Sequence, residues 1–480
     1  MIRPVKPSIA MGFYFFPRGG SAQVARYLCR ALGDGEYAPT LFAGSMGTPA
    51  DGSNAHKFFS GICCHSLDYT PARSEWCTSG DAMASSVPMP ASYEDKPGVP
   101  DRIFFDLDAA AFDRQVASWT RFFNSHAAVS PSLVHLHHLT PMHEAVRAVW
   151  PEAAVVTHLH GTELKMLESV DVCAGTDDES SRKRAWVERM RRWAGESDRV
   201  VVVAAHDQQL VHSLLPVDPD HVTRIANGVD TDVFAPRPKT HADRMQLWKR
   251  FLVERPRGWR AGGPAGSIRY QERDLEAFTD GAGQLVPVVL FAGRFMRFKR
   301  LQLLIEAHHA LRSTTTCRPV LVVAGGFPGE WEGEHPYDTV QRLGAEGVFF
   351  IGWREHDDLS EILSCSDVFA APSVEEPFGL VYLEAMASGI PPIATRSGGP
   401  LSFINLDQSQ PTGWLVEPDD PAAITRALEE AVSDRAGRIA RGERAAQFVR
   451  EHYSWSSSAA AFVRLYEAVL DEPRSSPRYE

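Results

Sequence analysis

Short runs of apolar residues alternate with longer amphipathic segments along most of the chain. Runs of this length that end at Gly, Pro or His predict buried strands, and the amphipathic segments predict helices. The predicted strands are 9–16, 38–44, 132–138, 153–159, 199–205, 222–226, 286–293, 319–325, 348–352, 367–372 and 391–395. The clearest helical segments are 20–33, 107–124, 300–312 and 378–389. Strands that alternate with helices predict an α/β protein whose parallel sheets are covered on both faces.

The strands form two series, which are separated by ANGVDTDVFAP at 226–236. A chain of 480 residues is also too long for one compact core. We therefore expect two domains, residues 1–232 and 233–455, followed by an amphipathic terminal helix in 456–480. Two stretches show no period, about 46–101 and 237–285. Irregular segments of that length are expected to be partly ordered covers near a pocket or inert insertions.

Composition and charge narrow the classes of protein to which the chain can belong. The chain has 44% hydrophobic and 23% charged residues, which is typical of a soluble globular protein. A net charge of −12 argues against a nucleic-acid binder and weakly against attachment to an anionic membrane. No apolar run approaches the roughly 18 residues that span a bilayer. Seven cysteines without a CxxC pair predict reduced thiols, and with no signal-peptide pattern at the N-terminus we expect a cytoplasmic protein.

Two glycine-containing turns are candidate phosphate sites. In FFPRGGSAQVARYL, Gly19 and Gly20 lie between a strand and a helix, where backbone N–H groups can approach an anion. In VLFAGRFMRFKRL, Arg294 and Lys299 follow a strand end, where two cations suit a diphosphate. Taken alone, the first pattern is also typical of a plain turn, and the second of a solvated basic turn.

The segment APSVEEPFGLVYLEAMASG combines carboxylates with a helix start. Glu384 lies eight residues after Glu376, two helical turns on and roughly on the same side. Gly379 and Leu380 begin the predicted helix, where free N–H groups suit phosphate oxygens. Carboxylates beside a phosphate would repel it, unless they bind an uncharged group such as a sugar hydroxyl. The arrangement therefore favours a ligand that carries both phosphate and hydroxyl groups.

Histidines cluster in SLVHLHH and AAVVTHLHG. In extended strands His135 and His137 share one face while His138 points to the other, and His158 shares a face with His160. If the two strands are parallel neighbours, these imidazoles collect at one edge of the sheet. A zinc site is one interpretation, but neither a cysteine partner nor a helical carboxylate–histidine spacing supports it. The alternative, buried rings bonded to the backbone, fits His135 and His158.

In this order, GG-helix, HG, NGVD, GR-x4-K and E-x-FG-x4-E, the motifs resemble those of the GT-B-fold retaining glycosyltransferases. The branch is the one shared with sucrose synthase, glycogen synthase and bacterial mannosyl- and glucosyltransferases. The resemblance is strongest over 286–420. It implies two Rossmann-like, doubly wound domains that face each other across a cleft, and a last helix that crosses back to the N-terminal domain. In one loop, GGPLSFI, Ser402 stands where the family usually has Glu.

The resemblance also implies roles for individual residues. Four would serve the reaction itself: His160, Arg294, Lys299 and Glu376. Residues that would bind the donor are Gly19, Gly20, Arg294, Lys299, Ile351, Arg354, Glu376, Phe378, Gly379, Leu380 and Glu384. Of these, Arg294 and Lys299 would grip the diphosphate, Glu384 the ribose, and Ile351 and Arg354 would lie by the nucleobase. Glu376 would bind the 3- and 4-hydroxyls of the donor sugar and His160 its 6-hydroxyl, with His137 and His138 on the acceptor side.

The implied reaction moves a sugar from a UDP- or GDP-linked donor to a small soluble acceptor with retention of configuration, by a front-face route that needs no metal cofactor. An acceptor in specialised-metabolite or thiol-cofactor biosynthesis is expected. No nucleic-acid partner and no membrane span are expected, and a homodimer is left open. Three alternatives stand beside this hypothesis: a nucleotide-sugar 2-epimerase of the same fold, a glycosyltransferase directed at a lipid or polysaccharide, and a non-catalytic sugar-nucleotide binder.

Overall fold

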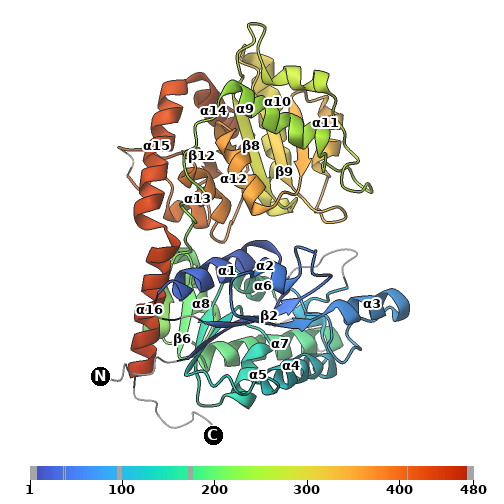
Figure 1. The fold of residues 1–480 in the computed structure, drawn as a ribbon, viewed down its shortest axis with the longest axis vertical. Coiled ribbons are helices and arrows are strands. Elements are labelled where there is room, and N and C mark those ends of the chain that lie inside the picture. The colour runs from blue at the N-terminus through green and yellow to red at the C-terminus, as the bar shows by residue number, and fades with distance from the viewer. Residues whose placement is uncertain are drawn as a thin grey trace. The chain divides into compact units, whose positions relative to one another are not determined.

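The structure of the chain is a computed structural model that describes residues 8–35, 37, 39–93, 100–170, 177–407 and 409–472. Residues 473–480 of the predicted terminal segment 456–480 lie outside the described residues, as do residues 94–99 of the predicted irregular stretch 46–101. The chain divides into two compact units (Figure 1). Unit 1 comprises Met1–Gly228 and Trp455–Glu480, and unit 2 comprises Val229–Ser454.

Unit 1 is built on a seven-stranded parallel sheet in the order β3-β2-β1-β4-β5-β6-β7. Its strands are β1 (Ile9–Phe13), β2 (Thr40–Ser45), β3 (Cys64–Asp68), β4 (Leu133–His137), β5 (Ala154–His158), β6 (Arg199–Val202) and β7 (Val222–Arg224). Its helices are α1 (Gly19–Gly33), α2 (Ala55–Phe58), α3 (Thr70–Ser79), α4 (Ala109–Asn124), α5 (Met142–Val149), α6 (Thr162–Ser169), α7 (Asp178–Gly195), α8 (Ala205–Leu214) and α16 (Trp455–Asp471). The predicted doubly wound α/β architecture is therefore present in this unit.

Aromatic side chains pack the helices of unit 1 against one another. Helices α4, α5 and α7 lie together on one side (Figure 1), where the ring of Trp193 stacks on His143 and the guanidinium of Arg189 covers Phe112. Helix α16 packs against α1, and the rings of Trp455 and Tyr27 stack with their centroids 5.8 Å apart. The central strands are buried along their whole length, because helices cover both faces of a parallel sheet.

Unit 2 has a six-stranded parallel sheet in the order β10-β9-β8-β11-β12-β13. Its strands are β8 (Val288–Gly293), β9 (Val320–Gly325), β10 (Val348–Gly352), β11 (Val368–Ala370), β12 (Pro392–Thr395) and β13 (Trp414–Val416). Its helices are α9 (His241–Lys249), α10 (Leu301–Thr314), α11 (Pro336–Leu343), α12 (His356–Ser364), α13 (Leu380–Ala387), α14 (Pro421–Ser433) and α15 (Arg435–His452). Helix α10 packs with α11 and α14, while α13 packs with α15.

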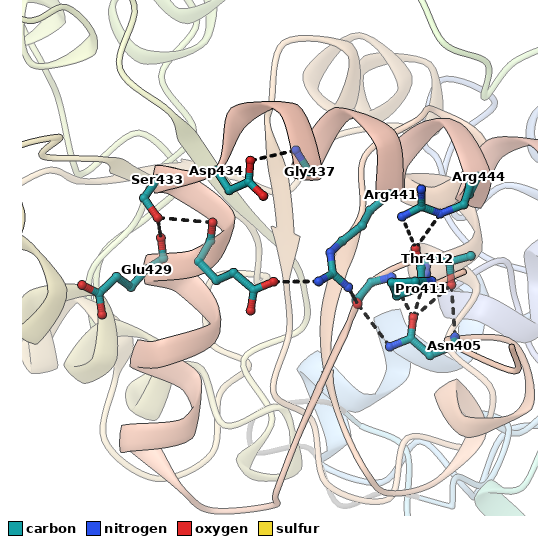
Figure 2. A network of polar contacts seen from close by, with 11 residues as sticks. Asn405, Pro411, Thr412, Glu429, Ser433, Asp434, Gly437, Arg441 and Arg444 are labelled. Atoms are coloured by element: carbon teal, nitrogen blue, oxygen red, sulfur yellow. Dashed lines mark hydrogen bonds and ion pairs between the residues drawn. The ribbon is translucent and has the colours of Figure 1, made fainter. Parts of the chain in front are cut away.

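Polar contacts fix the loop that leads into β13 (Figure 2). Arg441 on α15 donates a hydrogen bond of 2.9 Å to the Gly413 carbonyl, and Arg444 donates two bonds, of 3.0 and 2.9 Å, to the carbonyl of Pro411. The side-chain oxygen of Asn405 accepts from the Gly413 N–H at 2.9 Å. These bonds satisfy backbone groups that no strand or helix pairs, so the loop is ordered without regular structure.

The two stretches predicted to be irregular contain regular elements. The first, 46–101, carries α2, β3 and α3, and the strand pairs in parallel with β2. The second, 237–285, carries α9, a π-helical segment Arg250–Glu254 and a 3-10 helix Glu272–Phe278. Trp248, Phe251 and Trp259 bury their side chains there, so this stretch is part of the core of unit 2. The prediction that these stretches are irregular was therefore wrong for both.

Candidate active site

The strand order of unit 2 reverses between β8 and β11, because the chain runs outward from β8 to β10 and then returns to the other side of β8. Ligands of open parallel sheets bind outside the carboxyl ends of the strands at such a reversal. Two of the predicted motifs begin there: Arg294 follows β8, and the segment containing Glu376 follows β11. The fold thus brings the basic motif and the carboxylate motif to one point.

A buried ion pair joins these two motifs. Lys299 ends a 3-10 turn, Arg297–Lys299, and its ammonium group forms an ion pair with the Glu376 carboxylate. Their side chains are only 11% and 10% exposed. The Val374 N–H donates to the Phe298 carbonyl at 2.8 Å, so the backbones of the two loops are also bonded. Arg294 lies half-buried at the end of β8. The site therefore holds a cation and a carboxylate in fixed proximity.

Glycine backbones shape the loop around Glu376. The N–H of Gly399 donates to the Glu376 carbonyl at 2.7 Å. A Cβ placed on Gly398 would lie 2.5 Å from the same oxygen, and Gly398 has a φ of 70°, so only glycine fits there. Gly379, with a φ of 93°, precedes α13, and no side chain caps this helix. The N–H groups at Leu380 and beyond are therefore positioned to bind an anion.

Glu384 lies in the second turn of α13, and its side chain is buried. The Nε2 atom of His356 lies 2.7 Å from its Oε1 atom. The imidazole of His356 packs edge-on against Phe234, with centroids 4.9 Å apart. His356 was not among the predicted site residues. It starts the helix that follows β10, and this position at a strand end is the signal that could have found it. His356 fixes the orientation of the Glu384 carboxylate.

The segment predicted to lie by the nucleobase buries two of its side chains, and its place beside the nucleobase stays a prediction. Ile351 is fully buried, and Arg354 is buried with its guanidinium bonded to the carbonyls of Ile351, Phe251 and Arg255. Burial lowers the pKa of Arg354 to about 10, with the charge of Arg257 adding to the effect. Arg354 therefore braces the backbone rather than reaching toward a ligand. The residue between them that does reach the surface is Trp353, which is 38% exposed.

Phe378 is also buried, and its ring packs on Phe403 with centroids 5.6 Å apart. Its side chain therefore supports the loop from inside, and only its backbone is available to a donor. Ser402 stands where the glycosyltransferases that the sequence resembles usually have Glu, and it ends a 3-10 helix. Its carbonyl accepts a hydrogen bond of 2.8 Å from the Tyr453 hydroxyl. The departure thus lies in a segment that is bonded to the end of α15.

Unit 1 has its own strand reversal, between β1 and β4. Gly19 and Gly20 follow β1 and are exposed at the start of α1, which has no side-chain cap. A Cβ on Gly19 would meet no atom within 4 Å. The predicted glycine motif therefore presents open backbone at the expected edge of the sheet.

The histidines gather as the strand pattern predicted, since β4 and β5 are parallel neighbours with His137 opposite His158. We call His135, His137, His138, His158 and His160 the histidine cluster. Ring centroids within it lie 4.5 to 5.3 Å apart. Burial first, and then the neighbouring imidazoles, hold the pKa values of His137, His158 and His160 well below the usual range. These three rings are neutral at pH 7.

The prediction that His135 and His158 bond to the backbone was wrong. His137 and His138 are buried, whereas His160 is partly exposed, and the acceptor-side role of His137 and His138 stays a prediction. His135 bonds to the hydroxyl of Tyr466 at 2.6 Å instead of to the backbone. Neither ring nitrogen of His158 has a hydrogen-bond partner among the described residues. The parallel register placed the rings correctly, but it says nothing about the partners of each nitrogen.

Two buried carboxyl groups beside the cluster were missed. Glu163 on α6 accepts a bond of 3.0 Å from the His160 N–H, and its other oxygen lies 3.1 Å from Nδ1 of His138. Asp207 on α8 is 2% exposed, and burial, with a smaller contribution from the Glu163 charge, raises its pKa to about 7. Glu163 follows the HG motif by two residues, and that spacing was the available signal. Glu163 fixes the backbone at His160.

Comparisons with known proteins match both units. Residues 277–453 match the family described as Glycosyl transferases group 1, and residues 81–233 match the one described as Glycosyltransferase Family 4. A D-inositol 3-phosphate glycosyltransferase of Corynebacterium urealyticum is 34% identical over 42% of this chain and 51% of its own length. The protein of the same name from Corynebacterium kroppenstedtii is 28% identical over 71% of this chain and 68% of its own. The match thus spans about half to two thirds of these relatives.

Solved structures show the same fold. The sucrose-phosphate synthase of Thermosynechococcus elongatus aligns with a TM-score of 0.65 at 18% identity, covering 97% of this chain and 99% of its own. HepE of Anabaena, solved in complex with UDP and glucose, aligns with a TM-score of 0.64 at 15% identity, covering 96% and 100%. At these identities the likeness concerns the fold. Among the described residues, no helix is both long and apolar enough to cross a membrane.

Proposed function

Because the chain belongs to the GT-B-fold glycosyltransferases of group 1 and family 4, we propose that it moves a sugar from a nucleoside-diphosphate donor to a small acceptor with retention of configuration. The observation that carries the proposal is the buried Lys299–Glu376 pair beside the uncapped start of α13. A cation and open N–H groups suit a diphosphate, and a carboxylate suits the hydroxyls of the attached sugar. A donor of this class contains both groups.

Charge explains how these residues would act. Cleavage of the anomeric bond leaves a nucleoside diphosphate, so negative charge grows on the phosphate in the transition state. Lys299, Arg294 and the N–H groups of α13 are preorganised to stabilise that charge. Glu376 binds sugar hydroxyls and keeps Lys299 in place. In this proposal Glu376 is not a nucleophile, because the leaving phosphate itself takes the acceptor proton on the front face of the sugar.

The proposed reaction needs no metal at the donor. Lys299 and Arg294 supply the positive charge that a divalent ion gives to phosphate in other enzymes. His160 supplies a neutral imidazole for the sugar, and the bond from its N–H to Glu163 holds its backbone. Glu384, oriented by His356, binds the ribose hydroxyls. Each group thus serves a different part of the donor.

The acceptor is proposed to be a small molecule with free hydroxyls. The relatives named D-inositol 3-phosphate glycosyltransferase support this class and make D-inositol 3-phosphate the first compound to test. A test with UDP-, GDP- and ADP-linked sugars covers the donor, because the groups that contact the phosphates and the ribose do not depend on the base. Thermal shift with the free nucleoside diphosphates would rank the bases, since a tighter ligand gives a larger stabilisation.

The deciding experiment measures release of free nucleoside diphosphate with and without an acceptor. A transferase releases diphosphate in proportion to the acceptor consumed. An epimerase of the same fold acts on the nucleotide sugar without an added acceptor, and a non-catalytic binder releases nothing. Absence of acceptor-dependent release across the donors and a panel of hydroxyl, amine and thiol acceptors would contradict the proposal.

A further inference from the structure

The histidine cluster contains buried nitrogen atoms that the hydrogen bonding of the protein does not use. Within the part of the chain that the structure describes, Nε2 of His135, Nε2 of His137 and both ring nitrogens of His158 have no hydrogen-bond partner. All three side chains are 0% exposed. Buried polar atoms are nearly always bonded to protein, water or an ion. Unsatisfied nitrogens of three adjacent imidazoles therefore point to an occupant between them.

The sheet itself holds these three rings together. His135 and His137 lie on the same face of β4, and His158 lies opposite His137 on β5. One ring nitrogen from each residue can be chosen so that all three atoms lie within 4.8 Å of one another. The ring centroids are 4.8 Å apart for His135 and His137, and 5.2 and 5.3 Å from these to His158. The parallel register of β4 and β5 therefore brings the three histidines together.

We propose that His135, His137 and His158 bind one transition-metal ion, of which Zn²⁺ is the representative. Three imidazole nitrogens with one further position open form a common zinc ligand set. Zinc–nitrogen bonds of about 2.0–2.1 Å place the nitrogens of a tetrahedral site roughly 3.3 Å apart. The nitrogen atoms would therefore approach one another by up to about 1.5 Å from their present separation of up to 4.8 Å. Imidazole also suits Cu²⁺, Co²⁺ and Ni²⁺.

Outer contacts already orient two of the three ligands. Nδ1 of His135 lies 2.6 Å from the Tyr466 hydroxyl, and Nδ1 of His137 lies 2.9 Å from Nε2 of His160. A metal-binding histidine usually donates its second ring N–H to such a partner, which leaves the other nitrogen for the ion. We assign the proton of both rings to Nδ1 on this basis. Nε2 of His135 and of His137 then faces the ion.

This assignment links the ion to the proposed active site without placing it there. If Nδ1–H of His137 donates to Nε2 of His160, the neutral ring of His160 carries its proton on Nδ1. The ion would therefore select the tautomer of His160 through His137. The phenyl ring of Phe462 closes the other side, 5.1 Å from the ring of His135 and 5.2 Å from that of His158. The inference does not rest on the transfer reaction, because its test measures metal directly.

A buried carboxylate lies near the proposed ion and carries the opposite charge. Glu163 is 0% exposed, and its carboxylate lies 3.1 Å from Nδ1 of His138, a member of the same cluster. The ring of His138 lies 4.5 Å from that of His160. A buried carboxylate at the edge of the cluster offsets part of the cost of placing a cation among neutral ligands. A water molecule is the competing occupant, since it also bridges buried polar atoms.

The test begins with the full chain purified without chelator. We expect elemental analysis to find about one metal ion per chain. After metal is removed under mild denaturation and Co²⁺ is added during refolding, we expect the visible absorption bands of a tetrahedral cobalt site. Added Zn²⁺ should raise the melting temperature of the metal-free chain in a concentration-dependent way. A chain that holds no metal, gives no cobalt bands and shows no such rise would overturn the proposal and leave water as the occupant.

Three variants identify the site. His158→Gln removes one ligand and should abolish the cobalt bands. Tyr466→Phe removes only the hydroxyl that bonds His135, and the metal affinity should fall about 10–100-fold. The matched control is His143→Gln in the same unit, a buried histidine whose two ring nitrogens bond Thr140 and Thr157. Retention of full affinity by Tyr466→Phe and His158→Gln, or equal loss in the control, would refute the assigned ligands.

Discussion

Replacing Lys299 by Met tests the core of the proposed donor site. The substitution keeps most of the apolar stem but leaves the Glu376 carboxylate buried without its cation. Breaking a buried ion pair from one side costs about 3–5 kcal/mol. Because the two side chains keep 11% and 10% exposure, we expect the lower end, about 3 kcal/mol. Loss of one group that stabilises transition-state charge should lower turnover by about 10²–10³.

The neighbouring residue supplies a matched control. Arg300 forms an ion pair with Asp419, and these side chains are 28% and 52% exposed. An exposed pair contributes about 0–1 kcal/mol, so Arg300→Met should change stability and turnover little. Both proteins are compared by denaturant unfolding and by release of nucleoside diphosphate.

A double variant separates stability from catalysis. Lys299→Met with Glu376→Gln removes both charges, and stability should recover because no unpaired charge remains buried. Turnover should not recover, because the cation for the diphosphate is still missing. Equal stability of Lys299→Met and Arg300→Met, together with full turnover of Lys299→Met, would refute the reasoning.

Further predictions concern four other residues. Glu384→Gln should raise the donor KM about 10–100-fold with kcat nearly unchanged, and His356→Ala should raise it less, as steady-state kinetics with the parent chain as reference will show. His160→Ala should lower turnover about 10–100-fold while calorimetry finds the affinity for the nucleoside diphosphate nearly intact. The Asp207 carboxyl has its pKa raised from 3.8 to about 7, so the folded state binds a proton that the unfolded state releases, and stability falls as pH rises between these values. Unfolding curves should therefore show Asp207→Asn more stable than the parent above pH 7, on the order of 4 kcal/mol, and no difference below about pH 4.

The hydrophobic pattern predicted eleven of the strands, because buried parallel strands are nearly continuous apolar runs. It missed β3, whose sequence CHSLD is half polar and lies at the edge of the sheet, and β13, which has only three residues. Both depend on pairing with a neighbouring strand more than on their own residues. Tertiary contact also orders 237–285, where Trp259 donates a bond of 3.2 Å to the Gly326 carbonyl without any helical or strand period.

The candidate site was predictable in its positions and not in its contacts. Strand ends located Lys299 and Glu376, but their pairing joins residues 77 positions apart and depends on the order of β8 and β11. The sequence does not predict the direction of the Arg354 side chain. The resemblance placed Arg354 at the donor, whereas in the structure its guanidinium bonds three backbone carbonyls. His356 was missed because its role depends on contact with Glu384, 28 residues away.

The anomeric configuration of the product tests the central claim most directly. The chain is incubated with an α-linked nucleoside-diphosphate sugar and D-inositol 3-phosphate or another accepted molecule, and the new glycosidic bond is examined by NMR spectroscopy. Front-face transfer at the Lys299–Glu376 site predicts an α-linked product formed in equal amount with free nucleoside diphosphate. A β-linked product, or diphosphate released without any glycosylated acceptor, would contradict the account.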